Sequence, residues 1–177
     1  MGRRFTECSN CCENVFGAKV IALVGDLALT GQLKALGATH VLSYKSDSLV
    51  DDILAVNGGP VDSVLDVVGD ALFETSLTVL KKGGKFCISG SSGGQITQLD
   101  FRTLYLKHIT AYGSVLGTVA ELKQLLKAVA KGQVKPVIDC VFDLKDAKDA
   151  QLYFKEKDKL HKSGLNPVTT KKRTTTH

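Results

Sequence analysis

The sequence predicts an α/β protein built on a doubly wound parallel sheet, with helices on both faces. Over residues 17–118, short apolar runs rich in β-branched residues alternate with amphipathic segments, and a turn separates each pair. This alternation is typical of strand–helix–strand units, which lay successive strands parallel to one another. Loops rich in glycine and serine follow two of the runs, at Gly69 and at 89–94. Because ligands bind beyond the carboxyl ends of such strands, these loops are the first candidates for a site.

The first half of the repeat predicts two strands and two helices. The strands are expected at 17–25 and 39–44, and the helices at 26–36 and 47–56. Asp26 is suited to cap the first helix, because a short carboxylate accepts from the free N–H groups of a first turn. Gly37 is suited to follow its last turn, where a left-handed residue is common. The sequence Asn-Gly-Gly-Pro at 57–60 ends the second helix.

The second half continues the alternation and extends it toward the C-terminus. We expect strands at 63–68, 85–89 and 109–115, helices at 70–81, 100–107, 118–131 and 145–157, and an extended segment at 134–139. Thr118 and Glu121 form a capping-box pattern ahead of an apolar helix face, and Gly132 ends that helix. Pro136 places the extended segment on an edge or in a connection. Asp143 is suited to cap the last helix. The apolar face consists of Leu122, Leu125, Leu126 and Val129.

Length and composition favour one soluble globular domain. A chain of 177 residues buries roughly 70% of its unfolded surface on folding. Its 44% apolar and 23% charged residues are ordinary for that class. No apolar run reaches the ~20 residues of a membrane span, and no signal-peptide core follows the first five residues. The expected location is therefore the cytoplasm, with no membrane partner.

The positive charge is concentrated at the C-terminus. Residues 159–177 carry five Lys or Arg side chains and no acid, which accounts for the whole net charge of +5. Residues 1–158 are therefore neutral overall. We expect this basic, polar segment to be a disordered tail. A nucleic-acid-binding arm or a nuclear signal is the alternative, although a plain solvated tail is favoured.

The five cysteines favour neither disulfides nor a metal site. An odd number without a secretory signal argues against a disulfide framework. Cys87 lies in an apolar run and is expected to be a core thiol. The Cys8-x-x-Cys11-Cys12 cluster could supply part of a zinc site, but tetrahedral zinc usually needs four ligands and no further Cys or His pair stands nearby. We therefore predict no metal ligands.

Eight short stretches occur in an order and spacing that resemble one known family. They are GAKVIA at 17–22, KALGA at 34–38, VLSYK at 41–45, VLDVVG at 64–69, LKKGG at 80–84, LDFR at 99–102, GSVLGT at 113–118 and KPVID at 135–139. Together they resemble the nucleotide-binding half of the medium-chain dehydrogenase/reductase superfamily, nearest to its zinc-free quinone oxidoreductase, or zeta-crystallin-like, branch. The resemblance implies a Rossmann-like domain over 17–158, after a divergent segment at 1–16 and before the tail at 159–177.

Parts of the family pattern are missing from this chain. The resemblance implies an N-terminal catalytic domain, and a first strand with a G-x-G-x-x-G loop that aims N–H groups at the cofactor pyrophosphate. Residues 5–16 occupy the position of that loop and contain no glycine. We therefore predict a gap in the sheet between the strands at 18–24 and 63–68. Residues 3–8 are a poor replacement because a buried parallel strand is nearly all apolar. At the end, Gly164 and Pro167 argue against the strand that family members have there.

The resemblance implies NADPH in preference to NADH. An NAD-selective site needs an acidic side chain at the end of the second family strand, and the equivalent residue is about Val24. Gly25 and Tyr44 match two residues that surround the 2′-phosphate in NADPH-dependent members, although Leu29 replaces a lysine. Asp26 would repel that phosphate unless it turns into the helix cap. Tyr44 is equally compatible with being an ordinary half-buried tyrosine at a strand end.

Two further loops match the family's nicotinamide end. Val67, Val68 and Gly69 match the loop that passes the nicotinamide ribose, and Ser89, Gly90 and Ser91 match the loop near the ring. Glycine allows a close approach of the backbone to a ligand. The alternative is that these glycines merely end parallel strands. No catalytic residue is proposed, because the reduced cofactor itself supplies the hydride.

Three functions compete on these observations. The first is an NADPH-dependent oxidoreductase that reduces quinones or activated C=C bonds of a small-molecule substrate, and that is weakly active or inactive as this chain alone. The second is a non-catalytic remnant that acts through protein association. The third is a basic-tailed nucleic-acid binder, the least favoured of the three. The resemblance also implies a homodimer through the edge strand at 109–117.

Overall fold

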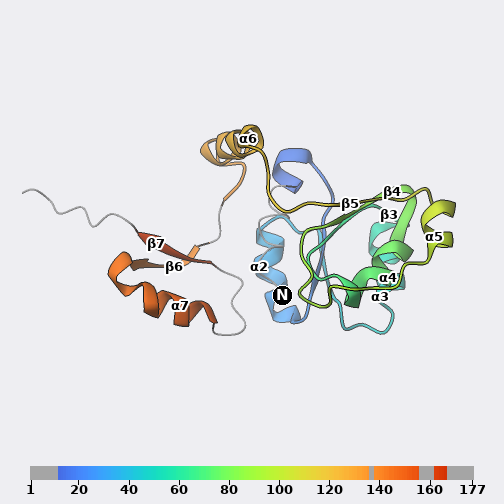
Figure 1. The fold of residues 1–177 in the computed structure, drawn as a ribbon, viewed down its shortest axis with the longest axis horizontal. Helices are drawn as coiled ribbons and strands as arrows, with labels where there is room; N and C mark the ends of the chain where they lie inside the picture. Colours follow the sequence, from blue (N-terminus) through green and yellow to red (C-terminus); the bar gives the residue numbers. More distant parts are fainter. Residues whose placement is uncertain (1–11, 136–137, 156–161, 167–177) are drawn as a thin grey trace, which may run out of the picture.

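The strand pairs that the computed structural model describes are all parallel, which confirms the predicted α/β class (Figure 1). The structure describes residues 12–135, 138–155 and 162–166. The described strands are β1 (Ile21–Val24), β2 (His40–Ser43), β3 (Val61–Asp66), β4 (Leu80–Ile88), β5 (Thr110–Gly113), β6 (Ile138–Asp143) and β7 (Lys162–Asn166). They form three sheets with the orders β1-β2, β3-β4-β5 and β6-β7.

The helices alternate with the strands as predicted. They are η1 (Leu27–Leu29), α2 (Thr30–Ala35), α3 (Leu49–Asn57), α4 (Asp70–Val79), α5 (Phe101–Leu106), α6 (Val119–Ala130), η2 (Leu144–Asp146) and α7 (Ala147–Lys155). The Asp26 carboxylate accepts from the Ala28 N–H at 2.9 Å, which confirms the predicted cap. Both halves of the capping box between Thr118 and Glu121 are present. Gly37 follows α2 with a φ of +102°.

Strand β1 shows why the sheet is covered on both faces. Ala22 and Val24 pack on one side, against Leu33 of α2. Ile21 and Leu23 alternate with them and pack on the other side, against a cluster that includes Ile53 of α3. Because successive side chains of a strand point to opposite faces, an all-apolar strand needs helices on both faces of the sheet to bury its side chains. This is the doubly wound arrangement that the sequence predicted.

Helices α4 and α5 cover one face of the second sheet. Leu77 and Phe86 are the centre of this cluster, and Leu104 of α5 packs against them. The rings of Phe73 and Phe86 meet edge to face, with centroids 5.3 Å apart. Such a contact adds about 1 kcal/mol to the free energy of burial.

The predicted gap lies between β1 and β3. These two strands belong to different sheets, and no strand lies between them in the part of the chain that the structure describes. Apolar packing joins the sheets instead, because Ile53 of α3 and Val79 of α4 belong to a cluster that includes Leu23 of β1 and Val64 of β3. Residues 3–8, the weak candidate for a replacement strand, lie outside the described residues.

Two lysines close the C-terminal ends of helices. The Lys107 ammonium donates to the carbonyls of Leu77, Thr78 and Leu80 at 3.1, 2.7 and 3.1 Å. Lys19 donates to the Val56 carbonyl at the end of α3, at 2.9 Å. The last carbonyls of a helix have no partner within the helix and form the negative end of its dipole. A cation there donates hydrogen bonds to these carbonyls and is attracted by the dipole.

Some sequence expectations were wrong in detail. Residues 12–16 are helical, in a segment for which the sequence predicted no helix or strand. Strand β4 begins at Leu80 rather than at 85, since its first residues continue directly from α4. Asp143 stands at the N-cap of η2, but its side chain makes no capping hydrogen bond and lies 3.7 Å from Lys145 instead.

The C-terminal strand was the largest error. Residues 162–166 form β7, which pairs with β6 in spite of Gly164 and the neighbouring Pro167. Strand β6 supplies the hydrogen bonds between the two parallel strands, and Pro167 follows the last paired residue, Asn166, in the sequence. Part of the expected tail at 159–177 is therefore a strand, while its last residues, 167–177, lie outside the described chain. The boundaries at 16 and 158 remain predictions.

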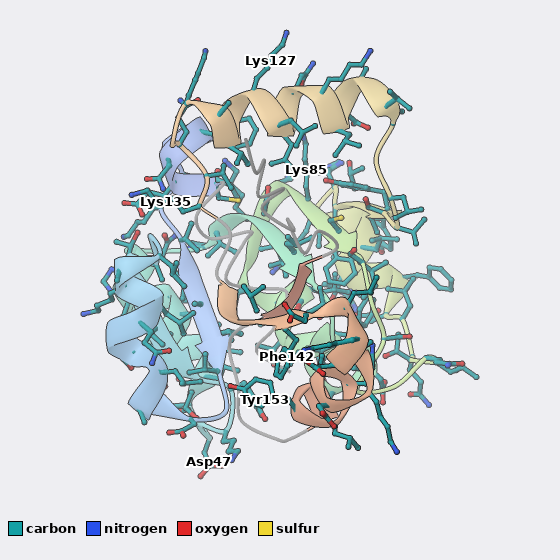
Figure 2. The ribbon with its side chains drawn as sticks, turned by 90° about the vertical axis from the view of Figure 1, so that its left-hand side faces the viewer. Asp47, Lys85, Lys127, Lys135, Phe142 and Tyr153 are labelled. Atoms are coloured by element: carbon teal, nitrogen blue, oxygen red, sulfur yellow. The ribbon has the colours of Figure 1, made fainter. Side chains whose placement is uncertain are left out.

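The C-terminal elements stand apart from the sheet of β3, β4 and β5 (Figure 1). Figure 2 shows Phe142 of β6 and Tyr153 of α7 directed toward one another, with ring centroids 5.6 Å apart. Helix α6 carries Lys127 on its outer side (Figure 2) and buries none of its residues. Its predicted apolar face is therefore present but largely exposed, with Leu122 53% exposed. None of the described helices has the length and apolarity to span a bilayer.

Candidate functional site

The first loop of the candidate site, residues 67–69, follows β3 and is held by Asp66. This aspartate is 3% exposed. Its carboxylate accepts from the Val68 N–H at 2.7 Å and from the Gly69 N–H at 3.1 Å. Gly69 has a φ of +86° and precedes the first residue of α4. The carboxylate therefore sets the direction in which the chain leaves the strand and enters the helix.

The second loop, residues 89–94, follows β4 and is bonded to the first. The Gly93 N–H donates to the Val68 carbonyl at 2.7 Å, and the Asp70 N–H donates to the Gly94 carbonyl at 3.3 Å. The Ser92 hydroxyl donates to the Val67 carbonyl at 3.2 Å. The structure thus brings together the six loop residues that the sequence singled out: Val67, Val68, Gly69, Ser89, Gly90 and Ser91.

Glycine is required where the two loops cross. A Cβ on Gly69 would stand 2.3 Å from the Gly94 carbonyl oxygen, and a Cβ on Gly90 would stand 2.9 Å from the Val67 carbonyl oxygen. Both distances are too short for a carbon against an oxygen. The glycines are therefore needed for packing between the loops, whether or not a ligand approaches them.

The loop side chains divide into buried and exposed ones. Val68 is 1% exposed, so this residue can offer only its main chain to a ligand. Ser91 is exposed, and Ser89 and Gly90 are partly exposed. The sequence reasoning missed Asp66, and it included Ser92, Gly93 and Gly94 in the candidate loop without giving them individual roles. Asp66 could have been found, because an aspartate at a strand end just before a glycine turn is typical of a side chain that bonds the backbone two residues on.

The carboxyl ends of β1 and β2 carry the other three predicted site residues: Gly25 and Asp26 follow β1, and Tyr44 follows β2. The Tyr44 hydroxyl lies 2.7 Å from the position that a Cβ on Gly25 would occupy. The Asp26 carboxylate is turned into the cap of η1. Leu29, in the position of the family lysine, packs against the cluster of Ala22 and neighbouring residues and supplies no charge.

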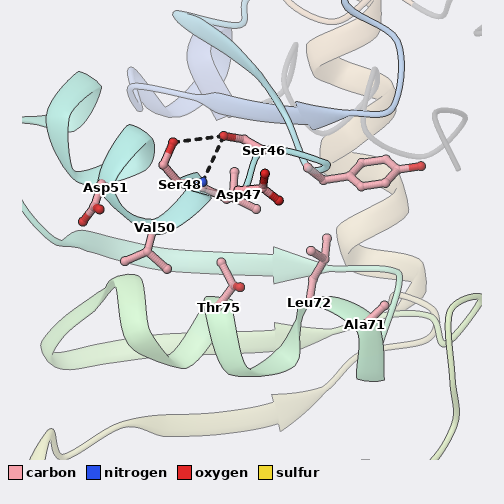
Figure 3. A pocket seen from close by; sticks show the side chains of 10 residues that line it. Ser46, Asp47, Ser48, Val50, Asp51, Ala71, Leu72 and Thr75 are labelled. Atoms are coloured by element: carbon pink, nitrogen blue, oxygen red, sulfur yellow. Dashed lines mark hydrogen bonds between the residues drawn. The ribbon is translucent and has the colours of Figure 1, made fainter.

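A hollow of about 240 Å³ adjoins Tyr44 (Figure 3). Ser46, Asp47 and Ser48 line one side, the first turn of α3 continues it, and Ala71, Leu72 and Thr75 of α4 line the other side. The Ser46 hydroxyl donates to the Asp52 carboxylate at 2.6 Å, which fixes the loop before α3. Asp47 and Asp51 give the rim a negative charge, so an uncharged group fits it better than a phosphate does.

The hollow connects the two groups of candidate residues. Tyr44 lines it from the first sheet, and Ala71 lines it from α4, two residues after Gly69. A Cβ on Gly93 would stand 3.3 Å from the Ala71 Cβ, which places the second loop beside the same helix start. A ligand that touches both Tyr44 and the loops would therefore cross the carboxyl edge of the sheets.

The described residues form no cluster suited to a metal ion. Across residues 12–135, 138–155 and 162–166, no three His, Cys, Asp or Glu side chains gather closely enough to hold a metal ion. Cys8 and Cys11 lie outside this part of the chain. Cys87 is buried, as predicted, and lies in register with Tyr112 of β5. The electrostatic effect of the neighbouring Cys87 sulfur, together with burial and a hydrogen bond to it, raises the pKa of Tyr112.

Comparisons with known proteins agree with this geometry. A family of zinc-binding dehydrogenases matches residues 10–131. The chain is 29% identical to quinone oxidoreductase-like protein 2 of Bos taurus over 150 residues, which are 79% of this chain and 43% of that protein. A putative alcohol dehydrogenase from Sinorhizobium meliloti superposes with a TM-score of 0.83 at 27% identity, covering 93% of this chain and 46% of its own. An NAD-dependent alcohol dehydrogenase superposes with a TM-score of 0.82 at 26% identity, covering 94% and 49%. The chain thus spans less than half the length of these proteins.

Proposed function

This chain belongs to the zinc-binding dehydrogenase family, within the medium-chain dehydrogenase/reductase superfamily, and on that premise we propose that it binds a nicotinamide dinucleotide, NADPH in preference to NADH. The observation that carries the proposal is the pair of crossed loops at 67–69 and 89–94. They combine close-packed glycines with a position at the carboxyl ends of β3 and β4, where dinucleotides bind in sheets of this kind.

The surroundings of Gly25 support NADPH. Val24 is buried and apolar, so it offers no carboxylate to the ribose 2′-OH that NADH presents. Asp26 is engaged in its helix cap, so its carboxylate is turned toward η1. Because Leu29 supplies no cation, we expect weaker phosphate binding than in members with a lysine there.

The hollow beside Tyr44 suits the adenine base. The base is uncharged and flat, and the hollow combines apolar side chains of α4 with hydroxyl groups and a negatively charged rim. A phosphate would be repelled by Asp47 and Asp51. We therefore place the base in this hollow, the 2′-phosphate near Gly25, and the nicotinamide end at the crossed loops.

The reaction follows from the cofactor. A bound NADPH would supply the hydride, and the protein would orient it toward a quinone or an activated C=C bond of a small molecule. The chain spans less than half of its relatives, so much of a substrate cleft would come from elements that the described fold does not contain. We therefore expect this chain alone to turn over slowly or not at all. A cytoplasmic location belongs to the same proposal.

A role through association is the second candidate. Tyr112, Val115 and Leu116 are 50%, 88% and 88% exposed, and β5 has a strand on only one side in the described chain. An exposed edge with apolar side chains beside it favours pairing with another strand. We propose that 109–117 joins two copies of the chain. A remnant that cannot turn over a substrate would retain this surface.

Titration with NADPH and with NADH tests the main proposal. The chain has no tryptophan, so the fluorescence of the reduced nicotinamide reports binding without interference. We expect saturable binding with NADPH tighter than NADH. A chain that is folded by circular dichroism and binds neither would overturn the oxidoreductase proposal and leave the association role.

A further inference from the structure

Asp66 is bonded to both loops of the candidate site. Its carboxylate accepts from the N–H groups of Val68 and Gly69 in the first loop. Its main-chain carbonyl accepts from the N–H of Ser89, the first residue of the second loop, at 2.8 Å. A single residue at the end of β3 therefore determines where both loops begin.

The burial of this carboxylate needs an explanation. A buried charge is costly unless it is compensated, and the ion pairs of the described residues join Lys81 to Asp62 and Lys145 to Asp143, not to Asp66. The compensation comes from two N–H groups and from the start of α4, whose dipole favours a negative charge. An asparagine offers one acceptor oxygen in place of two, so it would keep only one of these two bonds. Two bonds to separate oxygens of one side chain therefore hold the turn more firmly than a single cap would.

We propose that Asp66 is a positioning residue for the nicotinamide end of the cofactor. This inference rests on the proposed function. The carboxylate holds the amides of Val68 and Gly69, and in this arrangement Gly93 donates to the Val68 carbonyl and Gly94 passes over Gly69. The loops are thus ordered before a ligand arrives, so the entropy cost of ordering them does not weaken ligand binding.

The proposal predicts a loss that is confined to one half of the cofactor. In Asp66→Asn, an NH₂ group replaces one carboxylate oxygen and faces an N–H, so the first loop loses one bond and gains an opposed donor. At the adenosine end, Gly25 and Tyr44 follow another sheet, and the bonds of the Asp66 carboxylate end at Gly69, before the α4 residues that line the hollow. Whole NADPH should therefore bind less tightly while its adenosine part does not.

The experiment compares NADPH with 2′,5′-ADP, which carries the adenosine part alone. For Asp66→Asn we expect the Kd of NADPH to rise about tenfold, the effect of one lost bond to a charged acceptor, while the Kd of 2′,5′-ADP stays unchanged. The matched control is Asp62→Asn, on the same strand, whose exposed carboxylate pairs with Lys81 away from the loops. The control should change neither Kd.

The other possible results separate a failure of this inference from a failure of the proposed function. An equal rise for both ligands would mean a general structural role, and an unchanged NADPH affinity would mean none; either overturns the inference while the proposed function stands. If the unmutated chain binds neither ligand, the proposed function fails and the inference with it. Hydrogen exchange on the unmutated chain covers the case in which Asp66→Asn does not fold. The amides of Val68 and Gly69 should be protected without ligand, and fast exchange there would overturn the proposal.

Discussion

The Tyr44 hydroxyl lies 2.7 Å from the position that a Cβ on Gly25 would occupy, so the tyrosine ring rests against a residue with no side chain. The contact joins the ends of β1 and β2, which are paired in parallel up to Val24 and Ser43. It also closes one side of the hollow that we assign to the adenine base. The contact between these two residues therefore shapes the adenosine end of the candidate site.

Gly25→Ala tests this contact. Because Gly25 does not have a left-handed backbone, alanine is acceptable to the chain and only the tyrosine ring must move. We expect NADPH affinity to fall by about tenfold, which corresponds to about 1.4 kcal/mol. The double variant Gly25→Ala/Tyr44→Ala should show a non-additive loss in a double-mutant cycle of Kd values. Strict additivity would mean that the two residues act independently on the cofactor.

Gly69→Ala should strongly destabilise the fold. The substitution meets both a left-handed φ of +86° and the Gly94 carbonyl oxygen, so we expect a loss of more than about 3 kcal/mol in the free energy of unfolding. Gly58→Ala is the matched control, because Gly58 has a φ of +78° with open space around it. The control should cost only about 1–2 kcal/mol. Denaturant unfolding measures both, and equal losses would contradict the crossing of the loops.

Lys107→Met should destabilise the junction between α4 and β4. The ammonium group satisfies three carbonyls, and methionine keeps most of the apolar stem while leaving those carbonyls without that donor. We expect a loss of about 2 kcal/mol, the range for hydrogen bonds to a charged group. Lys82→Met, at a neighbouring exposed position, is the control and should change little. Thermal and denaturant unfolding give the comparison.

The cap of α6 should weaken in acid. The N–H and hydroxyl of Thr118 bond to Glu121 and lower the pKa of its carboxyl below the ordinary value of 4.5. A lowered folded pKa means that the cap contributes stability above about pH 4.5 and loses it as pH falls through the lowered value. We expect the protection of the amides at the start of α6, measured relative to their intrinsic exchange rates, to fall below that pH. Glu121→Gln should remove this pH dependence, and an unchanged profile in that variant would assign the effect elsewhere.

Self-association should depend on the residues that follow β5. Val115→Lys with Leu116→Glu places charges on two strongly exposed apolar positions, and a dimer through 109–117 should then dissociate. Ile96→Glu is the control, because Ile96 is as exposed but lies in another loop. Light scattering measures the mass of each variant. A monomeric unmutated chain would exclude this interface.

Much of the fold could be predicted because its causes are local. The apolar runs at 21–24 and 61–66, the Asp26 cap and the Thr118–Glu121 capping box all depend on residues a few positions apart. The gap between β1 and β3 in the described chain was also predicted, because a buried parallel strand must be apolar and the sequence at 3–8 is not. The strand at 162–166 was missed because its stability comes from pairing with β6, more than twenty residues earlier in the chain.

The sequence by itself determined the alternation of strands and helices, and it identified six loop residues at the carboxyl ends of β3 and β4. The tertiary structure alone decided that these loops bond to one another, that Asp66 is buried between them, and that Tyr44 rests on Gly25. The physical reason is distance along the chain. Capping and periodicity act between near neighbours, whereas the packing of Gly69 against Gly94 depends on how two strands with a helix between them come side by side.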